Sequence, residues 1–211
     1  TQELVFYDAT VKQRGKRDRV ILASKIIGPD GRFRNIRDGQ NRLTRANILA
    51  AVDGSLSRLG TDYIDLYQLH WPERSVNIFG RLTYTHHPDE TFTPFEEVLD
   101  VLDEAIRAGK IRHVGLSNET AWGAMRWLQL ADQGRGPRMA SIQNCYHMLN
   151  RGFEVGLSEV AIREQCGLLA FSPLGMGSLS GKYLNGARPA GARMTLFPNF
   201  PRYMTPRAQD A

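Results

Sequence analysis

Residues 62–72 have the sequence Asp-Tyr-Ile-Asp-Leu-Tyr-Gln-Leu-His-Trp-Pro, an apolar stretch that ends abruptly in His70, Trp71 and Pro72. The pattern predicts a buried β-strand with His70 at its C-terminal tip, because proline cannot donate a hydrogen bond to a sheet ladder. Leu59-Gly60-Thr61 closes a helix just before it. A histidine at a strand tip points out of the sheet, so His70 is a candidate for chemistry as well as for a structural role.

Composition favours a cytoplasmic protein with one hydrophobic core. The chain has 211 residues, 42% of them hydrophobic, and no apolar run approaches the ~20 residues of a membrane span. Its first residues lack the pattern of a secretory signal. The two cysteines, Cys145 and Cys166, fit a reducing compartment and the role of small buried side chains. We therefore expect a soluble domain without a disulfide framework.

The net charge of +5 does not indicate a nucleic-acid partner. The 27 Lys and Arg residues are scattered, and no basic run is interleaved with aromatic residues. A small phosphorylated ligand would explain part of the excess equally well.

Helical and strand patterns alternate along most of the chain. After a weak helical pattern at 3–14, the hydrophobic periodicity predicts elements that follow one another as strand, helix, strand. The predicted strands are 20–25, the central stretch to His70, 111–116, 139–145 and 167–171. The predicted helices are one capped by Thr44 and stopped by Gly60, one with a capping box at Thr93-Pro-Phe-Glu96, one over 120–133, and one over 153–165 with Val155, Val160 and Ile162 among its apolar positions.

Two segments lack periodicity. Residues 73–92 are longer than a usual connection, which is typical of a functional loop or an insertion. After Ser172 the chain is Gly-rich and irregular.

Alternating strands and helices predict parallel βαβ units, either in a doubly wound sheet or in a (β/α)8 barrel. A dinucleotide-binding doubly wound sheet should carry G-x-G-x-x-G after its first strand, and none follows Lys25. A barrel collects its active site from many C-terminal strand ends. Polar residues occur at or just after five consecutive predicted strand ends, namely Lys25, His70, Ser117, Asn118, Gln143 and Ser172.

These residue types suit carbonyl chemistry. An ammonium group such as that of Lys25 can lower the pKa of a neighbouring acid or form a Schiff base, and the His70 imidazole can donate a hydrogen bond to a carbonyl oxygen. Asn118 and Gln143 offer groups that recognise an amide, and the ring of Phe171 can stack on a flat heterocycle.

Several segments together resemble the aldo-keto reductase superfamily. They are Ala-Ser-Lys25, Arg58 to Pro72, Ala108-Gly-Lys-Ile-Arg-His-Val-Gly-Leu-Ser-Asn118, Ile142-Gln-Asn-Cys-Tyr146, Ala170-Phe-Ser-Pro-Leu-Gly175 and Ser180-Gly-Lys-Tyr-Leu184. Residues 149–157 and 183–193 resemble its prokaryotic Tas-like branch. The resemblance covers essentially the whole chain.

The resemblance implies a barrel that binds NADPH and transfers a hydride to an aldehyde or ketone. It implies that Lys25 and His70 are catalytic and that Trp71 lines the substrate pocket. The cofactor-binding residues that it implies are Ser117, Asn118, Gln143, Phe171, Ser172, Leu174, Gly175, Ser178, Lys182 and Arg193. The family usually has tyrosine or tryptophan at the position of Phe171. No metal site is expected.

The sequence also departs from the family pattern. We find no match for the family's catalytic aspartate and proton-donating tyrosine, since Tyr7 and Asp8 are adjacent and precede the lysine strand. Strands three to seven of eight are recognisable. We therefore expect residues 1–211 to form a single barrel domain that is incomplete at both ends, lacking the first two strands and the last.

Two other functions remain open at this point. One is a non-catalytic module that senses a nucleotide or binds a partner, as potassium-channel β subunits do, although those have Ser-Arg in place of Ser117-Asn118. The other is a lyase that forms a Schiff base on Lys25. The physiological carbonyl compound, the choice between NADPH and NADH, and the oligomeric state do not follow from the sequence.

Overall fold

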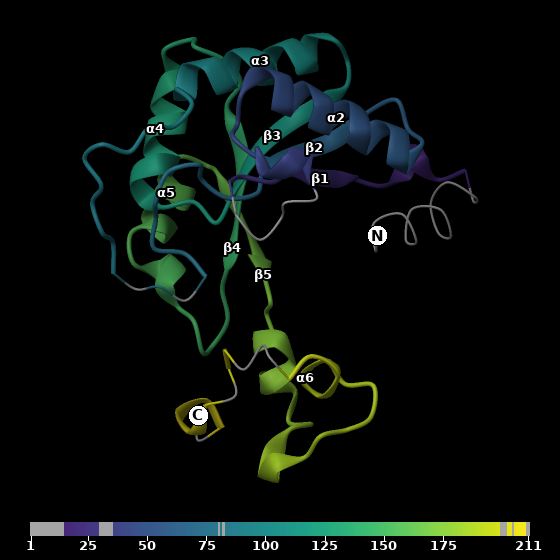
Figure 1. Ribbon diagram of the computed structural model, residues 1–211, viewed down its shortest axis with the longest axis vertical. Coiled ribbons are helices and arrows are strands. Elements are labelled where there is room, and N and C mark those ends of the chain that lie inside the picture. Colours follow the sequence, from purple (N-terminus) through teal and green to yellow (C-terminus); the bar gives the residue numbers. More distant parts are fainter. Residues whose placement is uncertain are drawn as a thin grey trace.

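The described residues form one sheet of five parallel strands (Figure 1). The structure, a computed structural model, describes residues 15–29, 36–79, 81, 83–198, 202–203 and 205–209. The strands are β1 (Ala23–Ile26), β2 (Ile64–Leu69), β3 (Ile111–Ser117), β4 (Met139–Cys145) and β5 (Gly167–Phe171), and they lie side by side in the order of the sequence. Sequential parallel order is that of consecutive barrel strands, whereas a doubly wound sheet reverses its order partway.

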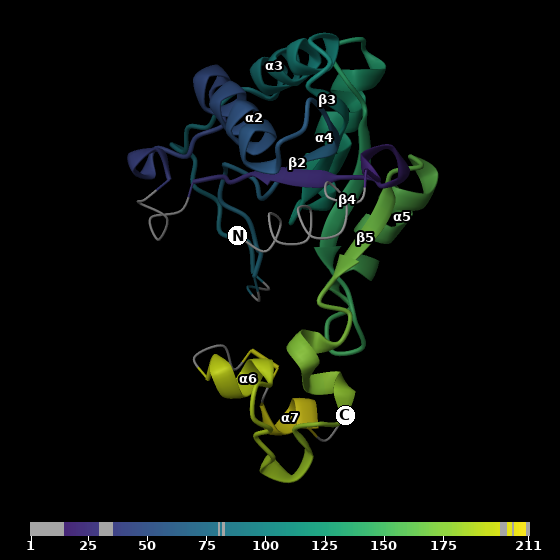
Figure 2. The same ribbon diagram turned by 90° about the vertical axis from the view of Figure 1, so that its right-hand side faces the viewer.

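Helices cover one face of this sheet (Figures 1 and 2). They are α2 (Arg45–Leu59), α3 (Phe95–Arg107), α4 (Ala121–Asp132) and α5 (Leu157–Arg163). The core lies between them and the outward-facing strand residues, among which Val114, Leu116 and Ile142 are at most 1% exposed. Burying such a side chain contributes about 1.5–3 kcal/mol. The core therefore fixes which face of each strand turns toward the helices and which faces the other way.

The ends of α2 follow from local sequence. The Thr44 hydroxyl accepts a hydrogen bond from the Asn47 amide, as a helix N-cap does. Gly60 ends the helix in the left-handed region at φ 60°, where glycine avoids the steric cost of a Cβ atom. Both features agree with the sequence prediction, and they deliver the chain directly into β2.

The capping box predicted at Thr93 is wrong. Helix α3 begins at Phe95, its N-cap is Pro94, and no side chain caps it. The Thr93 amide instead donates to Glu73 Oε1 at 2.9 Å, and the Thr93 hydroxyl is buried without a hydrogen-bond partner among the described residues. A contact with a distant loop has replaced the local cap.

The helix predicted over 153–165 is also wrong in its extent. Gly156 has φ 92° and divides the segment into a short 3-10 turn, Gly152–Glu154, and α5. Val155 and Ile162 are 84% and 78% exposed, so they do not belong to a buried face, while Val160 packs against the core. Strand β1 likewise covers 23–26 and not 20–25. The Leu22 amide donates to the Asp65 side chain instead of to a backbone carbonyl of a neighbouring strand.

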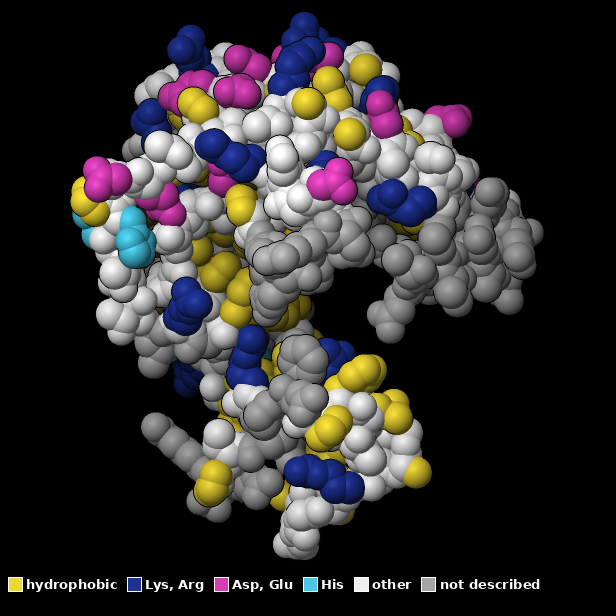
Figure 3. Space-filling model, in the orientation of Figure 1, with side chains coloured by type: hydrophobic (Ala, Val, Ile, Leu, Met, Phe, Trp, Pro, Cys, Tyr) yellow, Lys and Arg dark blue, Asp and Glu magenta, His cyan; other side chains and the backbone are white. Residues whose placement is uncertain are grey.

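Residues after β5 form a separate body, which we call the C-terminal lobe (172–198, 202–203 and 205–209). It contains only short elements, η5 (Gly175–Ser180), η6 (Leu184–Gly186), α6 (Arg193–Leu196) and α7 (Pro206–Gln209). The lobe lies beyond the C-terminal ends of β4 and β5, and the molecular surface is hollowed between it and the sheet (Figures 2 and 3). Three further short turns are η2 (Arg17–Arg19), η3 (Arg37–Gly39) and η4 (Gly152–Glu154).

Candidate functional site

Polar strand-end residues share the sheet face that the helices leave uncovered. Paired residues in parallel strands point to the same side, and the register pairs Lys25 with Gln68, Ser117 with Gln143 and Cys145 with Phe171. His70 follows β2, and its amide donates to the carbonyl of Ile26 at 2.9 Å. We call this group the strand-end site: Lys25, His70, Trp71, Ser117, Asn118, Gln143 and Phe171.

Lys25 and His70 are electrostatically coupled. Burial, and after it the positive charge of Lys25, lower the pKa of His70 from 6.5 to about 4. Both factors disfavour the imidazolium, since it would be desolvated beside a like charge. His70 is therefore neutral at physiological pH, and one of its ring nitrogens carries a hydrogen that can be donated.

Ser117, Asn118 and Gln143 form a hydrogen-bonded network. The carbonyl oxygen of Gln143 accepts from the Ser117 hydroxyl at 2.9 Å and from the Asn118 amide at 3.0 Å. Asn118, at φ 52°, turns its side chain back so that Nδ2 donates to the carbonyl oxygen of His70 at 2.9 Å. The network joins the ends of β2, β3 and β4 through backbone groups.

The network leaves some amide groups available. The side-chain amide of Gln143 is half-buried and makes no hydrogen bond with the described residues. Asn118 Oδ1 likewise accepts none from the described part of the chain. A donor and an acceptor at the edge of one sheet are suited to a ligand that carries an amide.

Trp71 forms a wall beside His70. Its ring centroid lies 4.6 Å from that of His70, and Phe79 packs edge-on against it at 5.9 Å. The indole Nε1 donates to the carbonyl oxygen of Pro29 at 3.1 Å. A Cβ atom on Gly28 would come within 2.7 Å of the ring, so this glycine makes room for the indole.

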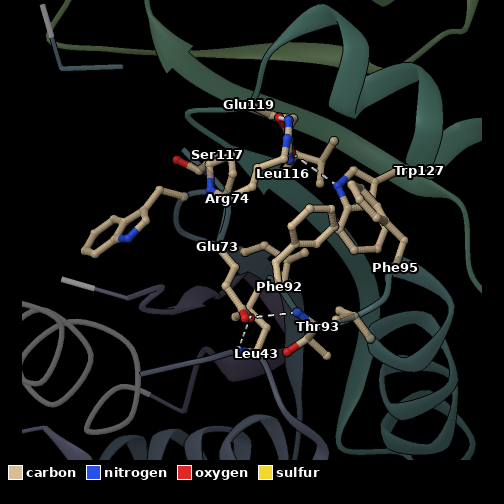
Figure 4. Close-up of a pocket in the computed structure, with 14 residues that line it drawn as sticks. Leu43, Glu73, Arg74, Phe92, Thr93, Phe95, Leu116, Ser117, Glu119 and Trp127 are labelled. Atoms are coloured by element: carbon tan, nitrogen blue, oxygen red, sulfur yellow. Dashed lines mark hydrogen bonds and ion pairs between the residues drawn. The ribbon is translucent and has the colours of Figure 1, made fainter. Parts of the chain in front are cut away.

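The structure adds two charged groups that sequence reasoning missed (Figure 4). Glu73 accepts hydrogen bonds from Arg42 Nε, the Leu43 amide and the Thr93 amide, at 2.6, 2.7 and 2.9 Å. Arg74 pairs with Glu119, and both side chains are nearly buried, at 9% and 3% exposed. Their only sequence signal is that each lies a few residues after a predicted strand end.

The remaining predicted cofactor residues belong to the C-terminal lobe or its entry. Ser172, Gly175 and Gly177 have positive φ values of 55°, 54° and 98°. The side chain of Lys182 lies over Gly177, where a Cβ atom would meet Lys182 Cε at 3.3 Å. Ser178 is half-buried, whereas Leu174, Lys182 and Arg193 are exposed. The predicted residues thus separate into a group ordered by the sheet and a group on the lobe.

Arg202 links the lobe to the strand-end site. With Trp71, Phe79 and Arg81 it lines an open pocket between the two bodies. The ring of Tyr203 packs edge-on against His147 at 4.5 Å, and its hydroxyl lies 3.3 Å from Cys145 Sγ. Cys145 follows Gln143 by two residues, so the lobe is docked next to the strand-end site.

Tyr7 and Asp8 lie outside the described residues. Within the described ranges there is no cluster of three side chains able to hold a metal ion, and no helix long and apolar enough to cross a membrane.

Comparison with known proteins completes the description. Residues 2–207 match the model of the aldo/keto reductase family. The chain is 52% identical over 200 residues to Protein tas of Escherichia coli, covering 94% of this chain and 58% of that protein. It is 43% identical over 197 residues to an aldo-keto reductase of Babesia bovis, covering 89% and 68%.

A solved structure is similar as well. The crystal structure of an aldo/keto reductase from Klebsiella pneumoniae in complex with NADP and acetate superposes with a TM-score of 0.62 at 27% identity, covering 88% of this chain and 53% of that one. The chain spans about 58% of the length of Protein tas.

Proposed function

This chain belongs to the aldo/keto reductase family, its fold is of the (β/α)8-barrel class, and from these premises we propose that the protein is an NADPH-dependent carbonyl reductase. It would transfer a hydride between the nicotinamide cofactor and a small aldehyde or ketone. The observation that carries the proposal is the coupled pair of Lys25 and His70, which holds a neutral imidazole beside an ammonium group at the strand ends.

The strand-end site fits a nicotinamide cofactor in its donor set. The free amide groups of Gln143 and Asn118 match a carboxamide, and Phe171 lies on the same face as Gln143. Ser172, Leu174, Gly175 and Ser178 would hold the pyrophosphate side through the turn that follows β5, with Lys182 and Arg193 providing positive charge. NADPH, when bound, supplies the hydride.

The chain's own residues would orient the carbonyl group and its charge. The neutral His70 imidazole would donate a hydrogen bond to the carbonyl oxygen, and Trp71 would limit the space beside it. The ammonium group of Lys25 would stabilise the ionised form of an acid next to it, so that the acid gives up its proton near neutral pH. A hydrogen-bond donor and a positive charge at one edge favour the negative charge that develops on the carbonyl oxygen.

Calorimetry tests the cofactor assignment. The protein expressed from its whole reading frame should bind NADPH, and the tryptophan fluorescence should be quenched because Trp71 borders the site. The same preparation should oxidise NADPH in the presence of small aldehydes. Absence of binding at high micromolar NADPH would remove the assignment. Binding without turnover would favour a nucleotide-sensing module, and borohydride trapping of a carbonyl compound on Lys25 would favour a Schiff-base lyase.

A further inference from the structure

We propose that Arg74 and Glu119 are positioning residues, a buried ion pair that holds the loop carrying His70 against the loop carrying Asn118. The proposal rests on the proposed function, because the two loops are those that would place the carbonyl group and the nicotinamide. Arg74 follows β2 and Glu119 follows β3, and they are 45 residues apart in the sequence.

The pair is bidentate and fully partnered. Arg74 donates from Nη1 to Glu119 Oε2 at 3.2 Å and from Nη2 to Oε1 at 2.5 Å. Oε1 also accepts from the Thr120 amide at 2.7 Å. Oε2 accepts from the indole of Trp127 at 3.2 Å (Figure 4). The Arg74 guanidinium lies 4.9 Å from the ring centroid of Trp122. Each charged oxygen therefore has at least two donors.

A glycine in α4 makes space for the pair. Gly123 is buried in the first turn of the helix, and a Cβ atom there would overlap Arg74 Nη2 and Glu119 Oε1. Glycine within a helix is less favourable than alanine. Helix α4 nevertheless has a glycine in the turn that contacts the ion pair.

Stability alone is a weak explanation for such a pair. Removing two charges from water is costly, and a buried ion pair can often be replaced by neutral groups of similar volume without loss of stability. What a bidentate pair does provide is a fixed geometry between the groups that it joins.

The geometry that this pair fixes is that of the strand-end site. Glu119 directly follows Asn118, and its amide and carbonyl exchange hydrogen bonds with the side chain of Asn144, at 3.2 and 2.9 Å. Asn118 in turn donates to the carbonyl oxygen of His70 at 2.9 Å. The two loops are thus joined at the site itself and again at Arg74–Glu119, and the second contact prevents rotation about the first.

The deciding variant is Arg74→Met/Glu119→Gln. It removes both charges, leaves no unpaired buried charge, and keeps one side-chain oxygen, which can accept from either the Thr120 amide or the Trp127 indole. We expect the melting temperature to stay near that of the unmodified protein, whereas the dissociation constant for NADPH rises and kcat with a small aldehyde falls, each about 10-fold or more, because displacements near 1 Å are costly in a positioned site. Arg74→Lys keeps a positive charge but loses the planar guanidinium. Its activity should lie between that of the double variant and that of the unmodified protein.

Glycine variants provide an independent arm. Gly123→Ala should weaken NADPH binding and turnover in the same direction. Gly54→Ala is the matched control in α2, where the new Cβ atom would meet only the flexible end of Arg58 at 3.0 Å, and both constants should be unchanged. In protein labelled with 5-fluorotryptophan, the ¹⁹F signal of Trp71 should shift in both the double variant and Gly123→Ala.

The outcomes separate this proposal from the proposed function. If the unmodified protein binds no NADPH, the proposed function fails, and the Trp71 signal still tests whether the ion pair orders the site. If the protein binds NADPH and the double variant matches it in binding, turnover and the Trp71 signal, the ion pair is only structural and the positioning role is overturned. A lower melting temperature with unchanged constants would overturn it equally.

Discussion

The strand-end site and the C-terminal lobe hold their side chains in different ways. In the strand-end site, Lys25, Ser117 and Gln143 belong to strands whose register fixes them, and the loops after β2 and β3 are joined through Asn118 and His70. In the lobe, the backbone hydrogen bonds are mostly local, such as Gly175 to Ser172 and Gly177 to Leu174.

Exposure does not follow the same division. Ser117 and Asn118 are 3% and 7% exposed, but the lobe combines buried Tyr183, Met194 and Tyr203 with leucines that are between 55% and 59% exposed. Among the described residues, Tyr203 of the lobe contacts His147, Cys145 and Asn150 next to the strand-end site. The two regions thus differ in the range of their backbone contacts, which join separate strands in the strand-end site and are mostly local in the lobe.

The largest effect is expected within the strand-end site. Lys25→Met keeps the length of the side chain and removes its charge, so reduction of a small aldehyde at neutral pH should fall by roughly 100-fold to 10,000-fold, the range typical of acid–base catalysis. NADPH binding should persist, because the amide network of Ser117, Asn118 and Gln143 is unchanged. Steady-state kinetics and calorimetry on one preparation would measure both.

The Lys25→Met variant also tests the contrast between the strand-end site and the lobe. If Lys25→Met turns over normally, Lys25 serves only to hold the edge of the sheet, and neither acid tuning nor Schiff-base formation survives. The role of the strand-end site would then reduce to binding.

What could be predicted from the sequence follows the same boundary. The bounds of β4 and β5 agree with the predicted 139–145 and 167–171, since short apolar runs between turns specify a strand locally. Once the strands are parallel, their ends must meet at one edge, so Lys25 and His70 could be expected together. The Asn118 bond to the His70 carbonyl needed the structure, because it depends on a positive φ value.

The failures have two physical causes, which are competition from a distant residue and a local break in a helix. The capping box at Thr93 fails because Glu73, 20 residues away, takes the amide. Gly156 interrupts the helix predicted over 153–165, and Val155 and Ile162, which match a helical period, face solvent. The Arg74–Glu119 pair and the glycine that admits it are equally invisible to periodicity. The roles of individual site residues stay predictions until the variants are measured.

A second prediction sharpens the comparison through the burial of His70. The pKa of His70 is about 4 in the folded protein and 6.5 in the unfolded chain. Between these pH values the unfolded chain therefore binds more protons than the folded protein. The contribution of a neutral His70 to the free energy of unfolding should therefore be fully present above pH 6.5. It should fall by about 2 kcal/mol as the pH drops toward 4, after allowance for partial solvent screening. Urea unfolding across this range would measure it.

His70→Gln should reduce this pH dependence without abolishing it. Burial also lowers the pKa of His147, which acts in the same direction and remains in the variant. If the free energy of unfolding depends on pH identically in the variant and the unmodified protein, His70 is accessible to water in the folded protein. The strand-end site would then be as hydrated as the lobe.

The smallest effect is expected in the lobe, and it is recognisable by its salt dependence. Lys182 is exposed and forms no ion pair with the described residues, so Lys182→Ala should raise the dissociation constant of NADPH by roughly twofold to fivefold at low salt. The effect should vanish near 1 M salt, where the screening length is about 3 Å.

Gln143→Ala is the matched variant in the strand-end site. It removes uncharged hydrogen bonds of about 1–3 kcal/mol, so its loss of affinity should be larger and nearly independent of salt. Calorimetric titrations at low and high salt would measure both constants. A salt-independent loss for Lys182→Ala would show that Lys182 is buried against the ligand when it binds, and the lobe would then close over the cofactor as tightly as the sheet holds it.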